Sequence, residues 1–189
     1  MTTPLTDAST VLVGRTVRLR AWREDDIEQV FQACQDVEIQ RWTRVPVPYA
    51  RDDATAFVGL CPERFAAGVP GFAITAQDDV TVLGSMGFVG PPHEGGVEFG
   101  YWIAPWARGR GVAGEATALL CDWAFDVAGL ARIEWMALVG NDPSRRVAER
   151  SGFQLEGTLR GRADNRGVRA DLWIAGLLRD DPRPWHAAT

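Results

Sequence analysis

The sequence predicts a single α/β (α+β) domain in which a mixed, mostly antiparallel sheet is flanked by helices. The 189 residues suit one domain with a sizeable core. Short runs of alternating apolar residues predict strands, and amphipathic runs between them predict helices. No repeat, linker or low-complexity segment divides the chain. We therefore expect one domain over 1–189, with its core over about 11–178 and irregular tails at 1–10 and 180–189.

The first half of the chain predicts strands and helices in irregular order. Acidic residues after Trp22 favour a helix start, because they complement the helix dipole. Gly84 and Gly87 lie inside a strand pattern and predict a bulge or a close approach of backbone. In order, we expect a strand over 11–20 around a turn at Gly14, a helix after residue 22, a loop or short helical piece over 36–49, a helix over about 52–67, and antiparallel strands over 72–76 and 82–89.

The second half has clearer boundaries. Asp142 as N-cap and Pro143 at the first helical position predict a helix start, and Gly152 predicts its end. Residues 131–139 have two largely apolar faces, which indicates a central strand. In order, we expect a strand over 97–103, a helix over about 111–127 that ends at Gly129, the strand 131–139, the short helix, and a final strand pair over 153–160 and about 169–178.

Composition excludes several classes of function. The net charge is −5, which does not favour a nucleic-acid partner. All 20 basic residues are Arg, so a lysine Schiff base and a P-loop lysine are excluded. Three separated cysteines and two histidines give no disulfide framework, metal site or Ser-His-Asp triad. No signal peptide and no apolar run of about 18 residues is visible, so we expect no membrane partner and a cytoplasmic location.

The stretch 98–115 is the strongest functional signal. An apolar strand stops at Pro105, and the glycine-rich turn RGRGVAG (108–114) leads directly into an amphipathic helix. Glycines let successive backbone N–H groups face an anion, and the helix N-terminus, Arg108 and Arg110 add positive charge. The pattern predicts a pyrophosphate site, with a plain tight turn as the alternative. A dinucleotide-binding fold fits poorly, because the strands before the turn look antiparallel.

Residues 108–113, RGRGVA, match the acetyl-CoA signature Arg/Gln-x-x-Gly-x-Gly/Ala of the Gcn5-related N-acetyltransferase (GNAT) family. Residues 100–105, GYWIAP, and 141–153, NDPSRRVAERSGF, resemble its branch of ribosomal-protein alanine and serine N-acetyltransferases, the RimJ/RimL type. The resemblance runs from about residue 11 to 178. It implies the GNAT fold, with a sheet of six to seven strands, and acetyl transfer from acetyl-CoA to an amine. It also implies that the strand ending near Ile103 splays from its neighbour.

By the same resemblance, acetyl-CoA would lie in the gap between the splayed strands. The N–H near Ile103 would polarise the thioester carbonyl. Asn141 would contact the pantetheine side, and Arg146 would reach the adenosine phosphate. The cofactor-binding residues that the resemblance implies are Trp102, Ile103, Ala104, Arg108, Gly109, Arg110, Gly111, Val112, Ala113, Gly114, Asn141, Ser144 and Arg146.

Acetyl transfer to an amine needs a base for the ammonium and an acid for the departing thiolate. Glu98 is the candidate base, because it precedes the splay point between apolar neighbours. The alternatives are a solvent-facing carboxylate or one that binds the charge of the acceptor. Ser144 stands where the family places a Ser or Tyr near the CoA sulfur, so it is the candidate acid, with helix capping as the alternative. The cysteines lie on predicted helices, which favours direct transfer in a ternary complex.

The acceptor side is expected in the irregular stretch 38–49 and the loop near 164–169. Trp42 and Tyr49 would wall a pocket, although Trp42 could instead plug the core. Glu38 or Asp171 would recognise a cationic acceptor, either a protein N-terminus or a small amine. A homodimer is a further hypothesis. A non-catalytic acyl-CoA-binding module is the alternative to an enzyme.

Overall fold

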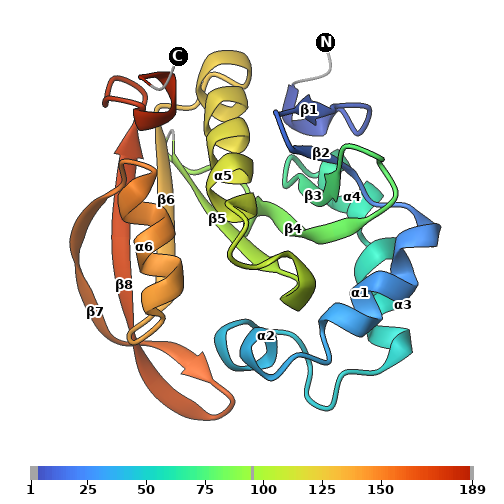
Figure 1. Ribbon diagram of the computed structural model, residues 1–189. Helices are drawn as coiled ribbons and strands as arrows, with labels where there is room; N and C mark the ends of the chain where they lie inside the picture. Colours follow the sequence, from blue (N-terminus) through green and yellow to red (C-terminus); the bar gives the residue numbers. More distant parts are fainter. Residues whose placement is uncertain (1–3, 95, 188–189) are drawn as a thin grey trace.

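The computed structural model describes residues 4–94 and 96–187, which form an eight-stranded mixed sheet with helices on both faces (Figure 1). The strand order is β1-β2-β3-β4-β5-β6-β8-β7, and every neighbouring pair is antiparallel except β5 and β6, which are parallel. The strands are β1 (Leu12–Val13), β2 (Val17–Ala21), β3 (Gly71–Ala76), β4 (Val82–Phe88), β5 (Gly96–Ile103), β6 (Arg132–Leu138), β7 (Gln154–Asn165) and β8 (Val168–Leu178). The predicted fold class is confirmed.

The described residues contain one strand more than the expected six to seven, because 11–20 forms two strands. Gly14 is the turning point, and its N–H donates to the Val17 carbonyl at 2.9 Å. A Cβ atom on Gly14 would lie 2.5 Å from the Glu115 carboxylate, so a side chain there would displace the end of the Glu115 side chain. The short strand β1 therefore pairs back on β2 at the edge of the sheet.

The helices are α1 (Ile27–Ala33), α2 (Val37–Trp42), α3 (Arg51–Gly59), α4 (Cys61–Ala66), α5 (Val112–Asp122) and α6 (Asp142–Arg150). The helix predicted over 52–67 is two helices, α3 and α4, which meet at Leu60. Pro62 lies in the first turn of α4, where its missing N–H is tolerated, whereas inside one long helix it would remove a hydrogen bond. The segment 36–49 contains α2, one of the two forms predicted for it.

The helices form two layers on opposite faces of the sheet. The Trp102 ring of β5 lies 6.3 Å from that of Trp22, which in turn packs against Phe57 of α3 at 5.3 Å. The preceding Tyr101 instead hydrogen-bonds to Ser144 of α6. Because neighbouring residues of a strand point to opposite faces, α3 and α6 lie on opposite sides of β5. The helix α5 lies in the layer of α6 and packs on β2, β4 and β5 (Figure 1).

The last two strands form a longer hairpin than predicted. β7 continues to Asn165, five residues beyond the expected end at Arg160, and pairs with β8 through two register shifts. Arg166 and Gly167 make the two-residue turn, with φ of 57° and 82°. Such positive φ values are what two-residue hairpin turns require. The expected loop at 164–169 is therefore a hairpin tip, which lies beside α2 (Figure 1).

The C-terminal residues are attached to α5. Residues 180–187, expected to be irregular, contain the 3-10 turn Pro184–His186. The Arg183 guanidinium forms ion pairs with Asp122 at 2.9 Å and Asp126 at 2.6 Å, and the Trp185 indole N–H donates to Asp122. Residues 1–3, 95 and 188–189, which include the ends of both expected tails, lie outside the described residues.

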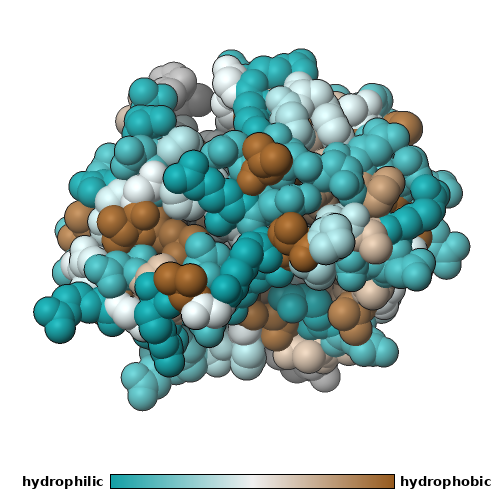
Figure 2. Space-filling model, turned by 90° about the horizontal axis from the view of Figure 1, so that it is seen from below, coloured by the Kyte–Doolittle hydropathy of each residue, from teal (hydrophilic) through white to brown (hydrophobic). Residues whose placement is uncertain are grey.

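The surface seen from below is mostly hydrophilic, and its hydrophobic residues form small separate groups (Figure 2). Within residues 4–94 and 96–187, no helix is both long and apolar enough to cross a membrane.

Candidate active site

The two central parallel strands diverge, as predicted. Pairing between β5 and β6 ends at Phe99 and Trp135, although β5 continues to Ile103 and β6 to Leu138. On its other side β5 stays paired with β4 up to Ile103, opposite Gly84. The edge of β5 that faces β6 is therefore open beyond Phe99, which leaves its backbone groups available to a ligand.

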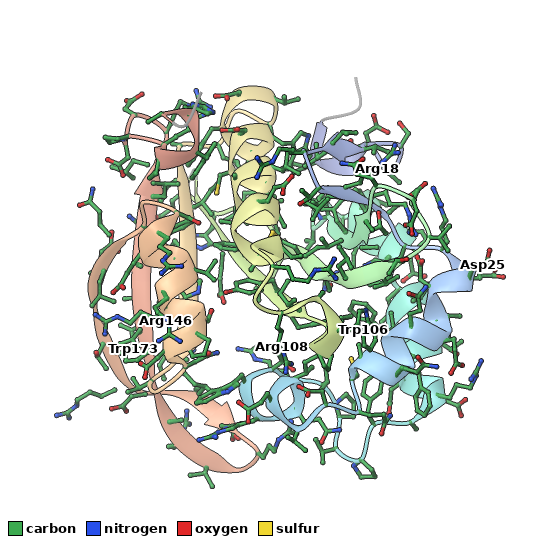
Figure 3. The ribbon with its side chains drawn as sticks, in the orientation of Figure 1. Arg18, Asp25, Trp106, Arg108, Arg146 and Trp173 are labelled. Carbon is green, nitrogen blue, oxygen red and sulfur yellow. The ribbon has the colours of Figure 1, made fainter. Side chains whose placement is uncertain are left out.

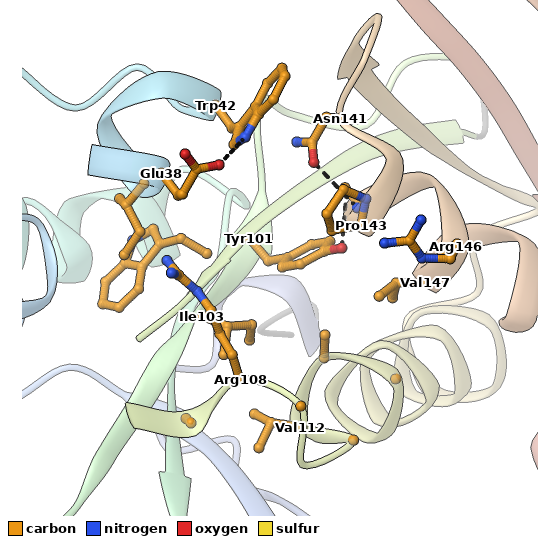
Figure 4. Close-up of a pocket in the computed structure, with 18 of the residues that line it drawn as sticks. Glu38, Trp42, Tyr101, Ile103, Arg108, Val112, Asn141, Pro143, Arg146 and Val147 are labelled. Carbon is orange, nitrogen blue, oxygen red and sulfur yellow. Dashed lines mark hydrogen bonds between the residues drawn. The ribbon is translucent and has the colours of Figure 1, made fainter. Parts of the chain in front are cut away.

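A cavity of about 650 Å³ lies at this divergence. Its walls come from α2, the end of β5, the glycine-rich turn with the start of α5, and α6 (Figure 4). The lining residues are Glu38, Ile39, Trp42, Thr43, Tyr101, Trp102, Ile103, Ala107, Arg108, Gly109, Gly111, Val112, Ala113, Gly114, Asn141, Pro143, Ser144, Arg146, Val147 and Arg150. All the predicted cofactor residues line it except Ala104, which is buried, and Arg110, which is exposed.

The glycine-rich turn needs its glycines for backbone reasons. Gly109 and Gly111 have φ of 73° and 79°, in the left-handed region that glycine occupies without strain. Gly111 is the N-cap of α5, and nothing lies within 4 Å of the position that a Cβ atom would take on it. The turn and the helix N-terminus therefore present backbone N–H groups and a partial positive charge to the cavity.

Arg108 contacts the opposite wall of the cavity. Its guanidinium donates to Asp36, the N-cap of α2, with Nη2 2.5 Å from Oδ1. This ion pair joins the glycine-rich turn to the helix that carries Glu38 and Trp42. Arg108 and Arg146 lie on either side of Tyr101, so both guanidinium groups flank the cavity (Figures 3 and 4).

The helix α6 begins one residue earlier than predicted. Asn141, not Asp142, is the N-cap, and its Oδ1 accepts from the Ser144 backbone N–H at 3.3 Å. Asn and Asp cap helices equally well, so the sequence Asn141-Asp142-Pro143 does not show which of the first two residues is the N-cap. The correction gives Asn141 a structural partner in addition to its place on the cavity wall.

One face of α6 carries arginines toward the cavity. Arg146 and Arg150 both line it, one turn apart. Arg145 lies on another face, where it pairs with Glu149 at 2.7 Å and stacks over the Trp173 ring at 4.8 Å. Arg150 could not be predicted as a lining residue, because the helix sequence alone does not say which arginines face the cavity.

The Ser144 hydroxyl forms two side-chain hydrogen bonds. The Trp135 indole N–H donates to its Oγ at 3.0 Å, and the Tyr101 hydroxyl lies 3.0 Å from the same atom. Burial raises the pKa of Tyr101 to about 12, so the phenol is protonated near neutral pH. Tyr101 was not among the residues predicted from the sequence. Its only local signal was a polar aromatic residue inside the GYWIAP motif.

Glu98 lies just before the divergence but does not line the cavity. It is the direct neighbour of Glu134 on β6, on the face of the sheet opposite to Tyr101. Burial is the main cause that raises the pKa of Glu98, and the like charge of Glu134 adds to it. Arg44 and Arg162 act in the opposite direction.

The predicted acceptor residues are only partly brought together. Glu38 and Trp42 line the cavity, and the Trp42 indole N–H donates to Glu38 at 2.9 Å. Tyr49 is 7% exposed and packs in the core. Asp171 is in β8, where it accepts from the Gly161 backbone N–H at 2.7 Å and does not line the cavity.

The hairpin tip contacts the α2 region through Arg166. Its guanidinium donates to the backbone carbonyls of Gln40, at 2.5 Å, and of Val45, at 3.1 Å. The two segments expected on the acceptor side, 38–49 and 164–169, therefore do lie together. Neither Arg166 nor this contact could be predicted from the local sequence, because the residues are more than 120 positions apart.

The three cysteines lie away from the cavity. Cys34, Cys61 and Cys121 are buried, and none of them lines it. Burial raises the pKa of Cys34 and of Cys61 to about 11, so neither thiol ionises readily near neutral pH.

Comparisons with known proteins agree with this geometry. The acetyltransferase (GNAT) domain family matches residues 16–154. The uncharacterized N-acetyltransferase p20 of Bacillus licheniformis is 30% identical over 173 residues, which cover 89% of this chain and 96% of p20. YdaF, a candidate ribosomal N-acetyltransferase of Bacillus subtilis, is 40% identical over 88 residues, 47% of this chain and 46% of YdaF.

Solved structures share the same fold. The structure of Mycobacterium smegmatis RimJ in complex with CoA-disulfide superposes with a TM-score of 0.83 at 23% identity, and covers 98% of this chain and 95% of RimJ. The family match includes the glycine-rich turn, the open edge of β5 and the start of α6. The chain belongs to the GNAT family and is an acetyl-CoA-dependent N-acetyltransferase.

Proposed function

We propose that this enzyme transfers the acetyl group directly to a primary amine in a ternary complex, with Glu98 as the base and Ser144 as the acid. The observation that carries this proposal is the divergence of β5 from β6, which opens a single cavity between the glycine-rich turn and α2. One end of the cavity is lined by the glycine-rich turn with Arg108, and another by Glu38 and Trp42. The cavity therefore suits a long ligand with phosphates at one end and a reacting group near the sheet.

The residues of the chain fit acetyl-CoA, which supplies an activated acetyl group as a thioester. Backbone N–H groups of 109–114 and the guanidinium of Arg110 would hold the pyrophosphate. The Arg108 guanidinium would leave the Asp36 carboxylate and bind the phosphate together with these groups. The open edge of β5, including Trp102 and Ile103, would hold the pantetheine amides as a strand neighbour would. An N–H of this edge would also stabilise charge on the thioester oxygen.

Glu98 would act as the base. An acceptor amine is protonated near neutral pH and must lose a proton before it can attack. A carboxylate with a raised pKa is a stronger base than an ordinary glutamate, and burial supplies that increase here. Glu98 lies one residue before the last β5–β6 pair, so it would take the proton directly or through a water.

Ser144 would act as the acid. Its hydroxyl lines the cavity and is fixed by Trp135 and Tyr101. A proton from Ser144 would neutralise the thiolate that leaves when the C–S bond breaks. Because no cysteine lines the cavity, the acetyl group would pass to the amine without an acetyl-cysteine intermediate.

The acceptor would enter beside α2 and the tip of the β7–β8 hairpin. Glu38 is the one carboxylate in the cavity lining among the described residues, and it would attract a cationic amine. Trp42 would form one wall. Two acceptor classes fit this entrance, a protein N-terminus and a small-molecule amine. RimJ- and RimL-type relatives make the protein N-terminus the first class to test.

An acceptor panel tests the proposal. Purified full-length protein is incubated with acetyl-CoA and with peptides that begin with Ala or Ser, amino acids, polyamines or aminoglycosides, and the free CoA thiol is measured. Each peptide is paired with its N-acetylated form as the matched control. We expect release with at least one free amine and none with its blocked partner. Tight acetyl-CoA binding without release for any amine, or an acetylated enzyme in the absence of acceptor, would contradict the proposal.

A further inference from the structure

The Ser144 hydroxyl lies at the meeting point of three elements. Ser144 is on α6, Tyr101 is on β5 and Trp135 is on β6, and both contacts to its Oγ measure 3.0 Å. Trp135 is 2% exposed, and Tyr101 and Ser144 both line the cavity. Figure 4 shows the Tyr101 hydroxyl directed at the start of α6. The cluster is thus buried on the protein side and open only toward the cavity.

The hydrogen-bonding capacity of these groups restricts the direction of the Ser144 proton. A serine hydroxyl has one hydrogen to donate and two lone pairs to accept with, whereas the Trp135 indole can only donate. Trp135 therefore occupies one lone pair of Oγ. A phenol is a better donor than an aliphatic hydroxyl, so Tyr101 occupies the second. With both lone pairs filled, the hydrogen of Ser144 must point away from Trp135 and Tyr101, toward the cavity.

We propose that Tyr101 is a positioning residue for the acid Ser144, fixing its hydroxyl as a donor into the cavity. This inference rests on the proposed function, in which Ser144 protonates the thiolate. Trp135, which also donates to the Ser144 hydroxyl, shares this positioning role with Tyr101. Burial of Tyr101 supports the inference, because the raised pKa keeps the phenol protonated and able to donate.

The same contacts stabilise the charge that develops during transfer. As the C–N bond forms and the C–S bond breaks, the proton of Ser144 moves to the thiolate sulfur and negative charge accumulates on Oγ. Two fixed donors, the indole N–H and the phenol O–H, face this charge, as in an oxyanion hole. The newly acylated nitrogen loses its second proton to solvent, and Ser144 regains one from solvent. The proton taken from the ammonium by Glu98 also returns to solvent, so each ammonium that is acetylated releases one net proton. Protons and electrons balance without any further reactant.

A double-mutant cycle of Tyr101→Phe and Ser144→Ala tests the inference. We expect Tyr101→Phe to lower kcat about 10- to 100-fold, the value of a hydrogen bond to a charged oxygen, with KM for acetyl-CoA nearly unchanged. In the Ser144→Ala background the same change should have little further effect, because the group that Tyr101 positions is absent. The inference would be overturned if Tyr101→Phe lowered kcat equally with Ser144 present and in the Ser144→Ala background. A rise in KM with unchanged kcat would also overturn it. Unchanged kcat in Ser144→Ala alone would instead refute the proposed acid.

The chain offers a matched control and a probe that preserves the fold. Tyr49 is the other of its two tyrosines, and it lies in the core away from the cavity, so Tyr49→Phe should retain full kcat. In that background, fluorotyrosine incorporated during expression is confined to position 101. The fluorinated phenol is a stronger donor of nearly the same size, so kcat should rise at pH values where it stays protonated. An unchanged or reduced kcat would contradict the role, even if Tyr101→Phe fails to fold.

Discussion

Arg108 of the glycine-rich turn and Asp36 at the N-terminus of α2 form an ion pair across the cavity, with Nη2 2.5 Å from Oδ1. The same carboxylate accepts from the backbone N–H groups of Glu38 and Ile39. One residue thus caps α2 and neutralises Arg108, a cation of the proposed pyrophosphate site. The Arg108 guanidinium is the main cause that lowers the pKa of Asp36, so the pair is fully charged near neutral pH.

Asp36→Asn should therefore strengthen acetyl-CoA binding. Asparagine caps a helix as well as aspartate does, so α2 should remain intact, while Arg108 loses its competing anion. The pair is partly exposed, so we expect a two- to fivefold decrease in Kd, equivalent to about 0.4–1 kcal/mol. Isothermal titration calorimetry measures this, with Asp52→Asn in the first turn of α3 as the matched control. Weaker binding by Asp36→Asn would show that Asp36 supports the cofactor site rather than competing for it.

Glu98→Gln should lower kcat about 100-fold or more, the usual contribution of a general base. As the proposed base, Glu98 would act when ionised, and its pKa is raised. The kcat/KM should therefore rise with pH around an apparent pKa above that of an ordinary glutamate. At pH values below this pKa, kcat/KM should be low. A pH profile from about 4.5 to 9 measures this limb. Glu63→Gln, on the exposed side of α4, is the charge control and should leave the profile unchanged.

Glu134→Gln offers an independent check of that profile. The groups that face Glu98 are Glu134 on β6, Arg44 after α2 and Arg162 on β7. Removal of the like charge leaves the two arginines, so the pKa of Glu98 should fall and the acid limb should move to lower pH. A limb that does not move would mean that another group titrates.

Arg146 and Arg150 should contribute to affinity for the phosphates of the cofactor. Both line the cavity, and no ion pair is found for either among residues 4–94 and 96–187. We expect Arg146→Gln and Arg150→Gln each to raise the Kd for CoA about 5- to 20-fold, with a smaller effect on dephospho-CoA if they contact the 3′-phosphate. Arg145→Gln is the control on the same helix, because Arg145 faces Glu149 and Trp173 instead. Equal losses for all three variants would indicate a general charge effect.

Gly84→Ala, on β4, should disturb the neighbouring end of β5, whose other edge is open toward the cavity. A Cβ atom there would lie 2.4 Å from the Trp102 carbonyl oxygen, so backbone must move. We expect a loss of about 1–3 kcal/mol in the free energy of unfolding and weaker acetyl-CoA binding. Gly59→Ala is the contrasting variant, because nothing lies within 4 Å of its Cβ position in α3. It should stabilise the protein by up to about 1 kcal/mol. Thermal and urea unfolding compare the two.

Local patterns predicted the elements whose signals lie within a few residues. α5 is followed by a π-helical turn over Trp123–Val127, and this helical stretch ends at Gly129. The glycine-rich turn, this end and the end of α6 at Gly152 depend on backbone conformations that glycine adopts, with φ of 77° at Gly129 and 80° at Gly152. The divergence of β5 and β6 came from the family resemblance of GYWIAP and NDPSRR. No periodicity in these strands encodes where pairing stops.

Contacts between distant segments could not be predicted. Tyr101 gains its partner from α6, 43 residues further along the chain, and Arg166 gains its partners from the α2 region. Tyr49 follows two prolines and was expected at a pocket wall, but the chain turns it into the core, where it is 7% exposed. These outcomes depend on how the layers pack, which no window of sequence contains.

The contact between Arg166 and the α2 region has a consequence for how such enzymes diversify. Arg166 binds backbone carbonyls, so the side chains of Gln40 and Val45 are not required for it. Substitutions along 38–45 can therefore change the chemistry of the proposed acceptor entrance without removing the contact between the hairpin tip and the α2 region. The glycine-rich turn and α6 lie outside this segment. The proposed acceptor entrance can thus differ in sequence without any substitution in the proposed cofactor-binding turn and helix.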